Sequence, residues 1–207
     1  LRELLENLSV KAAIPKPVLY TFPLATPTAF ALGHNWNQSA ILLSEGAIKN
    51  LNLREVEALL AFQVSQIRRL DTFLFGVAST LANTLMGLGR TLDYIWVPNF
   101  FRKKKKRRIF SRLIAPLVWL CLRLAVHKKV WLENDLNAAH LIENPMTMAE
   151  TLWKIHSITR TQPFEVPFGT AHLFAVNPLT KDRVDTHLIV HPGIETRIRN
   201  LVGFYPI

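Results

Sequence analysis

Residues 17–72 read PVLYTFPLATPTAFALGHNWNQSAILLSEGAIKNLNLREVEALLAFQVSQIRRLDT, and this stretch decides the fold. It holds three short segments of mainly apolar residues, separated by turns that contain proline or glycine. Such segments predict strands at residues 18–22, 29–32 and 40–43. Farther along, apolar residues recur every three or four positions, which predicts an amphipathic helix over residues 54–70. We therefore expect a small mixed sheet followed by a long helix with one buried face.

The flanking segments add helices but no further regular strands. Apolar spacing predicts helices near residues 1–12, 131–143, 146–157 and 194–202, with an irregular, proline-containing segment at 160–192. This order of elements places the chain in the α+β class, mainly helical with one small sheet.

The middle of the chain is unusually apolar. Residues 72–89 contain no charged side chain, and a second apolar stretch at 109–126 is broken by Arg112, Pro116 and Arg123. The first stretch reaches the length of a membrane-spanning helix, whereas the arginines compromise the second. We expect a long helical hairpin that contacts a membrane; a pair of core helices in a soluble protein is the alternative.

Charge is concentrated at one place. The chain has 25 basic and 15 acidic residues, and seven of the basic ones form an uninterrupted run between the two apolar stretches. Such a run suits an anionic lipid surface, an acidic protein or, less well, nucleic acid; a solvated loop is the alternative. The run comprises Arg102, Lys103, Lys104, Lys105, Lys106, Arg107 and Arg108.

Composition excludes several classes of protein. Hydrophobic residues make up 49% of the chain, which excludes a disordered protein. The single cysteine, Cys121, excludes an internal disulfide framework and a cysteine-rich zinc module. The first residue is Leu1 rather than methionine, which suggests a processed or trimmed chain.

The ordered set of motifs resembles the HtpX-like zinc metallopeptidases, gluzincins related to the CAAX prenyl proteases. The matching segments are TAFALG at 28–33, SEGAIKNL at 44–51 and EVEALLA at 55–61, then Asp135, Ala138, Ala139, Asn144-Pro145, His191-Pro192, Arg197-Ile198 and Leu201. The resemblance implies a zincin-like core split by a hairpin. The expected parts are residues 1–71 and 128–207 for the two halves of the core and 72–127 for the hairpin.

The sequence departs from this family at the metal site. A zincin helix carries His-Glu-x-x-His, whose imidazoles bind zinc and whose glutamate activates water. The aligned residues here are Phe62, Gln63 and Gln66: phenylalanine has no donor atom, and a glutamine amide is neither a base nor a good zinc ligand. The family's third ligand, a glutamate four residues before Asp135, corresponds to Trp131.

We therefore expect an inactive pseudopeptidase that needs no zinc or other cofactor. Phe62 and Trp131 should meet where the metal would lie. The leading hypothesis is a structural or regulatory subunit of a membrane-associated protein complex, with the side of the membrane that the core occupies left open. A peptide-binding module is the alternative, with a groove beside an edge strand at Ala40, Ile41, Leu42 and Leu43. Binding of lipid or nucleic acid through the basic run is a further alternative.

A rebuilt active site is the least favoured interpretation. It would have to use Glu133, His140 or the pair His187 and His191, which has i, i+4 spacing but no intervening glutamate and is followed by proline. Two ordinary histidines in a strand or turn are the simpler interpretation of that pair. His34, Cys121 and Ser65 likewise lack the partners that catalysis or metal binding requires.

Overall fold

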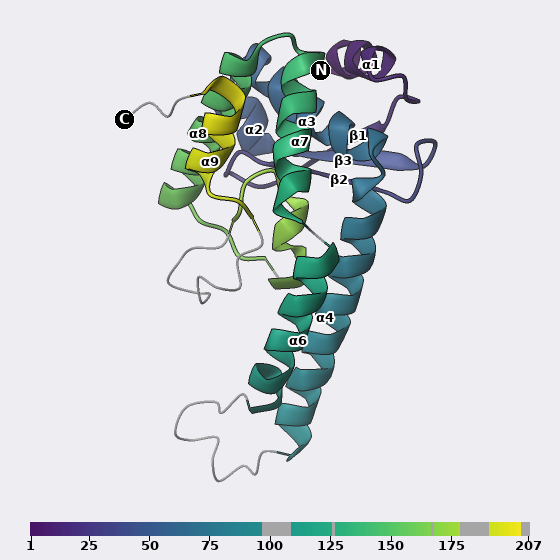
Figure 1. Ribbon diagram of the computed structural model, residues 1–207, viewed down its shortest axis with the longest axis vertical. Helices are drawn as coiled ribbons and strands as arrows, with labels where there is room; N and C mark the ends of the chain where they lie inside the picture. Colours follow the sequence, from purple (N-terminus) through teal and green to yellow (C-terminus); the bar gives the residue numbers. More distant parts are fainter. Residues whose placement is uncertain (97–108, 126, 167, 179–190, 204–207) are drawn as a thin grey trace.

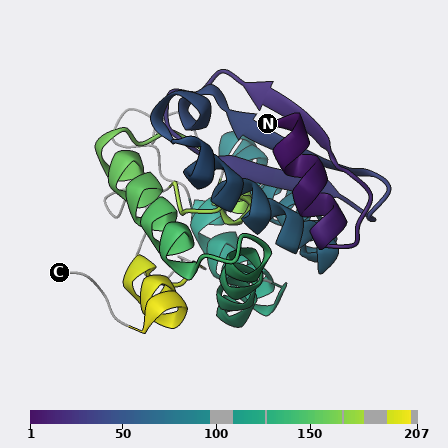
Figure 2. The ribbon, with the colours of Figure 1, turned by 90° about the horizontal axis from the view of Figure 1, so that it is seen from above.

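The computed structural model describes residues 1–96, 109–125, 127–166, 168–178 and 191–203. Its α-helices and three-stranded sheet form a head, from which a two-helix hairpin projects (Figure 1). In the head lie α1 (Arg2–Lys11), α2 (Glu45–Asn50), α3 (Leu53–Arg68), α7 (Lys128–Leu141), α8 (Pro145–Thr161) and α9 (Ile194–Val202). Seen from above, α1 and the sheet lie on one side of the head, and α8 and α9 on the other (Figure 2).

The sheet comprises β1 (Val18–Phe22), β2 (Ala29–Gly33) and β3 (Ser39–Ser44) in the order β1-β3-β2. β3 pairs in parallel with β1 and antiparallel with β2, so the sheet is mixed as predicted. Because β3 is the central strand, both of its edges are hydrogen-bonded. The prediction that residues 40–43 form an edge strand is therefore wrong, and these residues offer no free strand edge to a peptide.

Helix α3 is the centre of the head. A capping box starts it: the Asn52 side chain accepts from the Glu55 amide, and the Glu55 carboxylate accepts from the Asn52 amide. From Ala58 to Ile67 every residue is buried, because α3 is covered by the sheet, α1, α7 and α8. The predicted helix over 54–70 is thus observed, two residues shorter at its end.

The hairpin consists of α4 (Asp71–Trp96) and α6 (Ile109–Ala125), which lie side by side (Figure 1). They approach closely at Gly89, where an added Cβ would lie 3.1 Å from the Cα of Ser111. The Asp93 carboxylate accepts hydrogen bonds from the amides of Phe110 and Ser111, which fixes the start of α6. The basic run, residues 102–108, lies outside the described residues.

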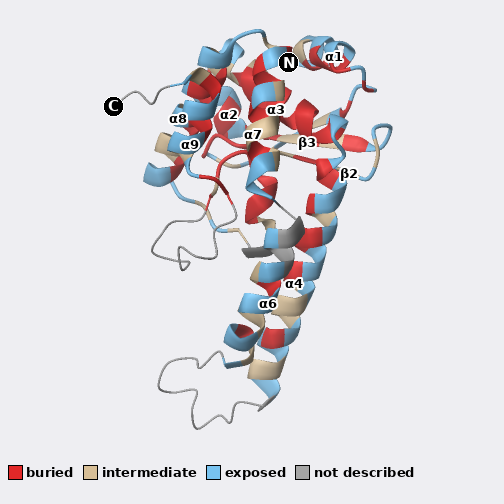
Figure 3. Cartoon of the chain, viewed as in Figure 1, coloured by how far each residue is buried: buried red, intermediate tan, exposed pale blue. Residues whose placement is uncertain are grey.

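Burial differs sharply between the two parts. Buried residues fill the interior of the head, whereas many apolar side chains of the hairpin are exposed (Figure 3). In the described part of the chain, one helix, over Asp71–Ile95, is long and apolar enough to cross a membrane; 33% of its most apolar window is buried. The second helix has only a shorter apolar segment, Ile109–Leu120.

Between α8 and α9 the chain forms a 3-10 helix, η1 (Phe168–Leu173), which packs against α4. Helix α8 begins with Pro145 directly after its cap, Asn144, a position where the missing amide hydrogen costs nothing. His172 of η1 thereby contacts Phe75 of α4, and His191, just before α9, contacts Trp131 in the first turn of α7.

Candidate functional site

The degenerate site is built from the facing sides of α3 and α7. Phe62 and Gln66, four residues apart, share one face of α3, and α7 supplies Trp131. The rings of Phe62 and Trp131 stack with centroids 5.9 Å apart and 21° between their planes. The contact that the sequence predicted between these two residues is therefore observed.

Two further rings enclose Trp131. Phe75 of α4 stacks on it at 5.9 Å, and the imidazole of His191, just before α9, lies 4.1 Å from it. Trp131 is fully buried, with an exposed fraction of 0%. Nothing in the sequence around Phe75 predicts a place at this site. The spacing of His191 predicts only an ordinary histidine, although His191-Pro192 is among the segments that match the HtpX-like pattern.

The two glutamines are buried but only partly hydrogen-bonded. The Gln63 amide nitrogen donates to the carbonyl oxygen of Ala29 at 3.3 Å, which ties α3 to β2. Within the described residues, Gln63 Oε1, Gln66 Nε2 and Trp131 Nε1 have no hydrogen-bond partner. An amide takes up no proton at neutral pH, so Gln63 supplies no general base.

A buried ion pair lies beside the rings. The Arg197 guanidinium donates two hydrogen bonds to the Asp135 carboxylate, at 2.6 and 2.7 Å, and both side chains are almost completely buried. Burial raises the pKa of the Asp135 carboxyl, and the Arg197 charge opposes that rise. Arg197 also lies over the rings of Phe62 and Trp131, at 5.3 and 5.4 Å. The pair therefore orients α7 and α9 around the aromatic cluster.

Two buried histidines complete the surroundings. His172 Nε2 contacts the carbonyl oxygen of Phe75 at 2.9 Å, and His191 Nε2 contacts that of Ala171 at 3.0 Å. Because a carbonyl only accepts, each imidazole carries its proton on Nε2. Burial lowers the pKa of both imidazoles, that of His191 to about 3, so both are neutral.

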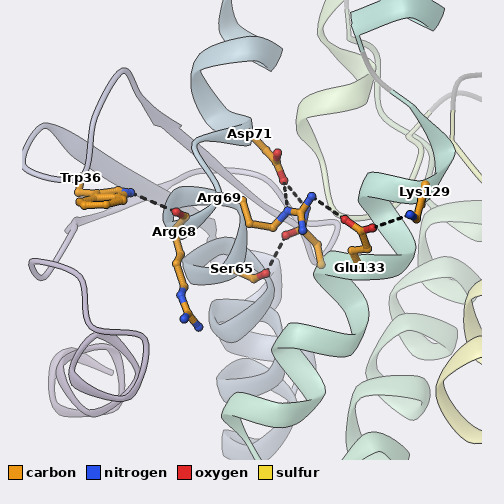
Figure 4. A network of polar contacts seen from close by, with 8 residues as sticks. Trp36, Ser65, Arg68, Arg69, Asp71, Lys129 and Glu133 are labelled. Atoms are coloured by element: carbon orange, nitrogen blue, oxygen red, sulfur yellow. Dashed lines mark hydrogen bonds and ion pairs between the residues drawn. The ribbon is translucent and has the colours of Figure 1, made fainter.

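Zinc does not fit this set of residues. Phe62 has no donor atom, the indole of Trp131 only donates, and an amide is a poor ligand for zinc. Glu133 faces elsewhere: its carboxylate binds Arg69 at 2.6 Å and Lys129 at 3.4 Å (Figure 4). The described residues contain no group of three histidine, cysteine, aspartate or glutamate side chains that could hold a metal ion.

Comparison with known proteins decides the family. The model of "Peptidase family M48" matches residues 1–204, nearly the whole chain. The chain belongs to peptidase family M48. The predicted resemblance to the HtpX-like metallopeptidases is confirmed, as is the α+β fold class with its small mixed sheet.

Several M48 relatives are named proteases. A protease HtpX homolog of Syntrophotalea carbinolica is 28% identical over 203 residues, which are 95% of this chain and 73% of the relative. The homolog of Methanocaldococcus jannaschii is 28% identical over 98% of this chain and 74% of its own length. Protease HtpX of Legionella pneumophila is 26% identical over 98% and 75%. No solved structure matches the chain significantly.

In this M48 chain β2 is an edge strand, and its Ala29 carbonyl oxygen accepts from Gln63 of the degenerate site. The free edge of β2 is partly occupied by the chain itself: Phe174 bridges to Phe30, and the Ala175 amide donates to Ala29. The Phe174 ring also packs on Phe30 at 5.2 Å. A peptide could therefore pair with β2 only by displacing this segment.

The remaining candidates take ordinary structural roles. Ser65 donates to Asn134 in a buried network, and His34 and His140 are exposed. His187 lies outside the described residues, as does the basic run.

Proposed function

We propose that this chain is a catalytically inactive member of family M48 that serves as a structural or regulatory subunit of a membrane-associated protein complex. One observation carries the proposal: the side chains at the zinc-ligand positions, Phe62, Gln66 and Trp131, are buried, and the two rings are stacked. A hydrolytic zinc centre requires donor atoms and an open coordination position there.

The residues around the site support a protein that keeps the family's fold but lacks the groups for zinc binding and hydrolysis. The ion pair between Asp135 and Arg197 and the cap of α3 are intact, so the elements that flank the site keep their places. Only the groups that would bind metal and activate water are absent. A protein that acts by binding a partner needs a stable fold but not the groups that carry out hydrolysis, and this is the arrangement proposed here.

The membrane part of the proposal rests on α4. Eighteen consecutive uncharged residues, 72–89, rise about 27 Å along a helix, close to the roughly 30 Å hydrocarbon core of a bilayer. Helix α6 has ten uncharged residues between its arginines, about 15 Å. The hairpin is thus unequal, and α4 is the helix suited to deep insertion.

The test is zinc content measured by elemental analysis on protein purified without chelators, with a peptidase assay on the same sample. We expect a folded protein, by circular dichroism, with neither stoichiometric zinc nor turnover. Protease HtpX of Legionella pneumophila, purified in parallel, is the positive control. Stoichiometric zinc, or turnover that a chelator abolishes, would contradict the proposal.

The subunit role has its own measurement. Native electrophoresis of membranes solubilised in mild detergent should show the chain in an assembly larger than the purified chain in the same detergent. Migration identical to that of the purified chain would refute the subunit role and leave the inactivity untouched.

A further inference from the structure

The projecting hairpin has an exposed apolar surface that the head does not cover. Large apolar side chains on both helices are about half exposed or more; they include Leu74, Leu81 and Leu88 of α4 and Leu113, Leu117 and Leu120 of α6. Water is an unfavourable environment for so many neighbouring apolar groups, and a bilayer is a favourable one. If the hairpin enters a bilayer, the junction between hairpin and head lies at the bilayer surface, so the residues at this junction are the ones that would meet lipid headgroups.

Cationic side chains gather at that level. Arg123 lies near the end of α6, and Lys128 and Lys129 open α7; all three are exposed. Arg123 lies over the ring of Trp119 at 5.0 Å. In the described part of the chain, Lys128 has no acidic partner, and Lys129 shares Glu133 with Arg69. Positive charge is therefore available where the apolar surface begins.

An exposed tryptophan lies at the same end of the hairpin. Trp36, in the turn between β2 and β3, is 47% exposed, yet its indole nitrogen donates to the carbonyl oxygen of Arg68 at 3.1 Å. Arg68 is the last residue of α3, and α4 begins three residues later. Figure 4 shows Trp36 and Lys129 on either side of the end of α3. Tryptophan with its ring half exposed and its N–H bonded is typical of the membrane–water interface.

The junction itself is held by a polar network. Asn134 donates to the Asp71 carboxylate at 2.7 Å and accepts from Ser65, while Arg69 binds both Asp71 and Glu133 (Figure 4). Such a network, part of it buried, fixes the orientation of α4 relative to α3 and α7. The groups on either side of the junction therefore keep a constant position relative to the hairpin.

We propose that Trp36, Arg123, Lys128 and Lys129 form a basal collar that binds the anionic headgroups of a lipid bilayer. The proposal rests on the membrane association proposed above and adds how far the hairpin inserts into the bilayer. The collar lies in the headgroup layer while the hairpin enters the hydrocarbon. Lipid fits better than an acidic protein because the cations directly adjoin the apolar surface, and a bilayer presents both kinds of environment in that order.

The first test measures depth at Trp36. The protein is reconstituted into phosphatidylcholine bilayers in which the acyl chains are brominated either near the headgroup or near the chain end. The difference in quenching between the wild type and Trp36→Phe isolates this indole from the other four tryptophans. We expect stronger quenching by bromine near the headgroup. Equal or absent quenching of Trp36, in protein that is bound to the bilayer, would overturn the proposal.

The second test measures lipid selectivity. Spin-labelled phosphatidylglycerol and phosphatidylcholine are compared for contact with the reconstituted protein. We expect Lys128→Gln/Lys129→Gln to lower the preference for phosphatidylglycerol. The matched control, Lys16→Gln/Lys49→Gln, removes the same charge from exposed lysines of the head and should leave the preference unchanged. The basic run is intact in both variants, so its contribution cancels.

The outcomes separate the two proposals. If the protein fails to float with neutral vesicles or to insert on reconstitution, membrane association itself is refuted. If the protein inserts but the Lys128→Gln/Lys129→Gln variant retains the lipid preference of the control, binding of headgroups by the collar is refuted, and membrane association of the hairpin is not. Binding of an acidic protein in the absence of lipid that depends on Lys128 and Lys129 would also overturn the assignment to lipid.

Discussion

Replacing Trp131 with alanine removes the largest fully buried side chain of the head from the centre of the degenerate site. Its ring contacts Phe62, Phe75 and His191 and lies beneath the Arg197 guanidinium. Loss of a buried tryptophan costs about 3–5 kcal/mol, and three ring contacts place this one in the upper half, at about 4–5 kcal/mol. For a chain of this size the corresponding fall in Tm is roughly 8–20 °C.

The assay is thermal unfolding in one detergent, followed by circular dichroism so that loss of a fluorophore does not matter. Trp131→Phe is the matched variant: it keeps a ring and loses an N–H that has no partner among the described residues, so it should cost only about 1–2 kcal/mol. A loss below about 1 kcal/mol for Trp131→Ala would refute the placement of this ring in the core. Equal losses for the two variants would contradict the assignment of this stability to the packing of an aromatic ring. Neither zinc nor chelator should change the Tm of any of these proteins.

Three further changes test other parts of the structure. Because burial lowers the pKa of His191 to about 3, the unfolded chain binds the proton more readily. The contribution of His191 to the free energy of unfolding is therefore fully present above the ordinary histidine pKa of about 6.5 and falls toward acid, by about 2 kcal/mol at about pH 5. Urea unfolding at a series of pH values should show a steeper loss of this free energy with falling pH for the wild type than for His191→Gln. Asn134→Ala leaves a buried hydroxyl and a carboxylate short of partners at the hairpin junction, and should cost about 2–3 kcal/mol in the same assay. Gly46→Ala places a Cβ 1.9 Å from the carbonyl oxygen of Ala25 and should cost about 3 kcal/mol, whereas Gly76→Ala, with open space around it, should be neutral or slightly stabilising by thermal unfolding.

Much of the fold was predictable because its signals are local. Pro17 and Pro23 flank β1, Gly33 ends β2, and Asn52 caps α3, so the boundaries of these elements follow from residues next to them. The contact between Phe62 and Trp131 was also predictable, since the family resemblance places both at one metal centre. Turn and cap residues therefore predict the boundaries of the elements around the site, and the family resemblance predicts the contact between Phe62 and Trp131.

Strand order was not predictable in the same way, because it depends on pairing between distant segments. A signal was nevertheless present: residues 40–43 are all apolar, whereas an edge strand usually alternates, and such a run is typical of a central strand. Phe75 and His172 come from the hairpin and η1, and only tertiary packing brings them to the site. Neither residue carries a pattern in its own neighbourhood that distinguishes it from an ordinary core side chain.

On the proposal that this chain binds no zinc, the aromatic cluster accounts for a folded core at this position without metal. Two imidazoles and a carboxylate without zinc would leave buried polar groups unpaired, each at a cost of about 1–3 kcal/mol. Phe62 and Trp131 avoid that cost and add apolar burial, so the proposal predicts a stability that does not depend on metal concentration, unlike that of a protein that binds metal only when folded. The exchange is incomplete, because Gln63 Oε1 and Gln66 Nε2 remain without partners in the described part of the chain. Gln66→Met removes an unpaired amide and should raise the Tm in the same thermal assay. Gln63→Leu also removes the hydrogen bond to the carbonyl oxygen of Ala29, so its gain should be smaller than that of Gln66→Met.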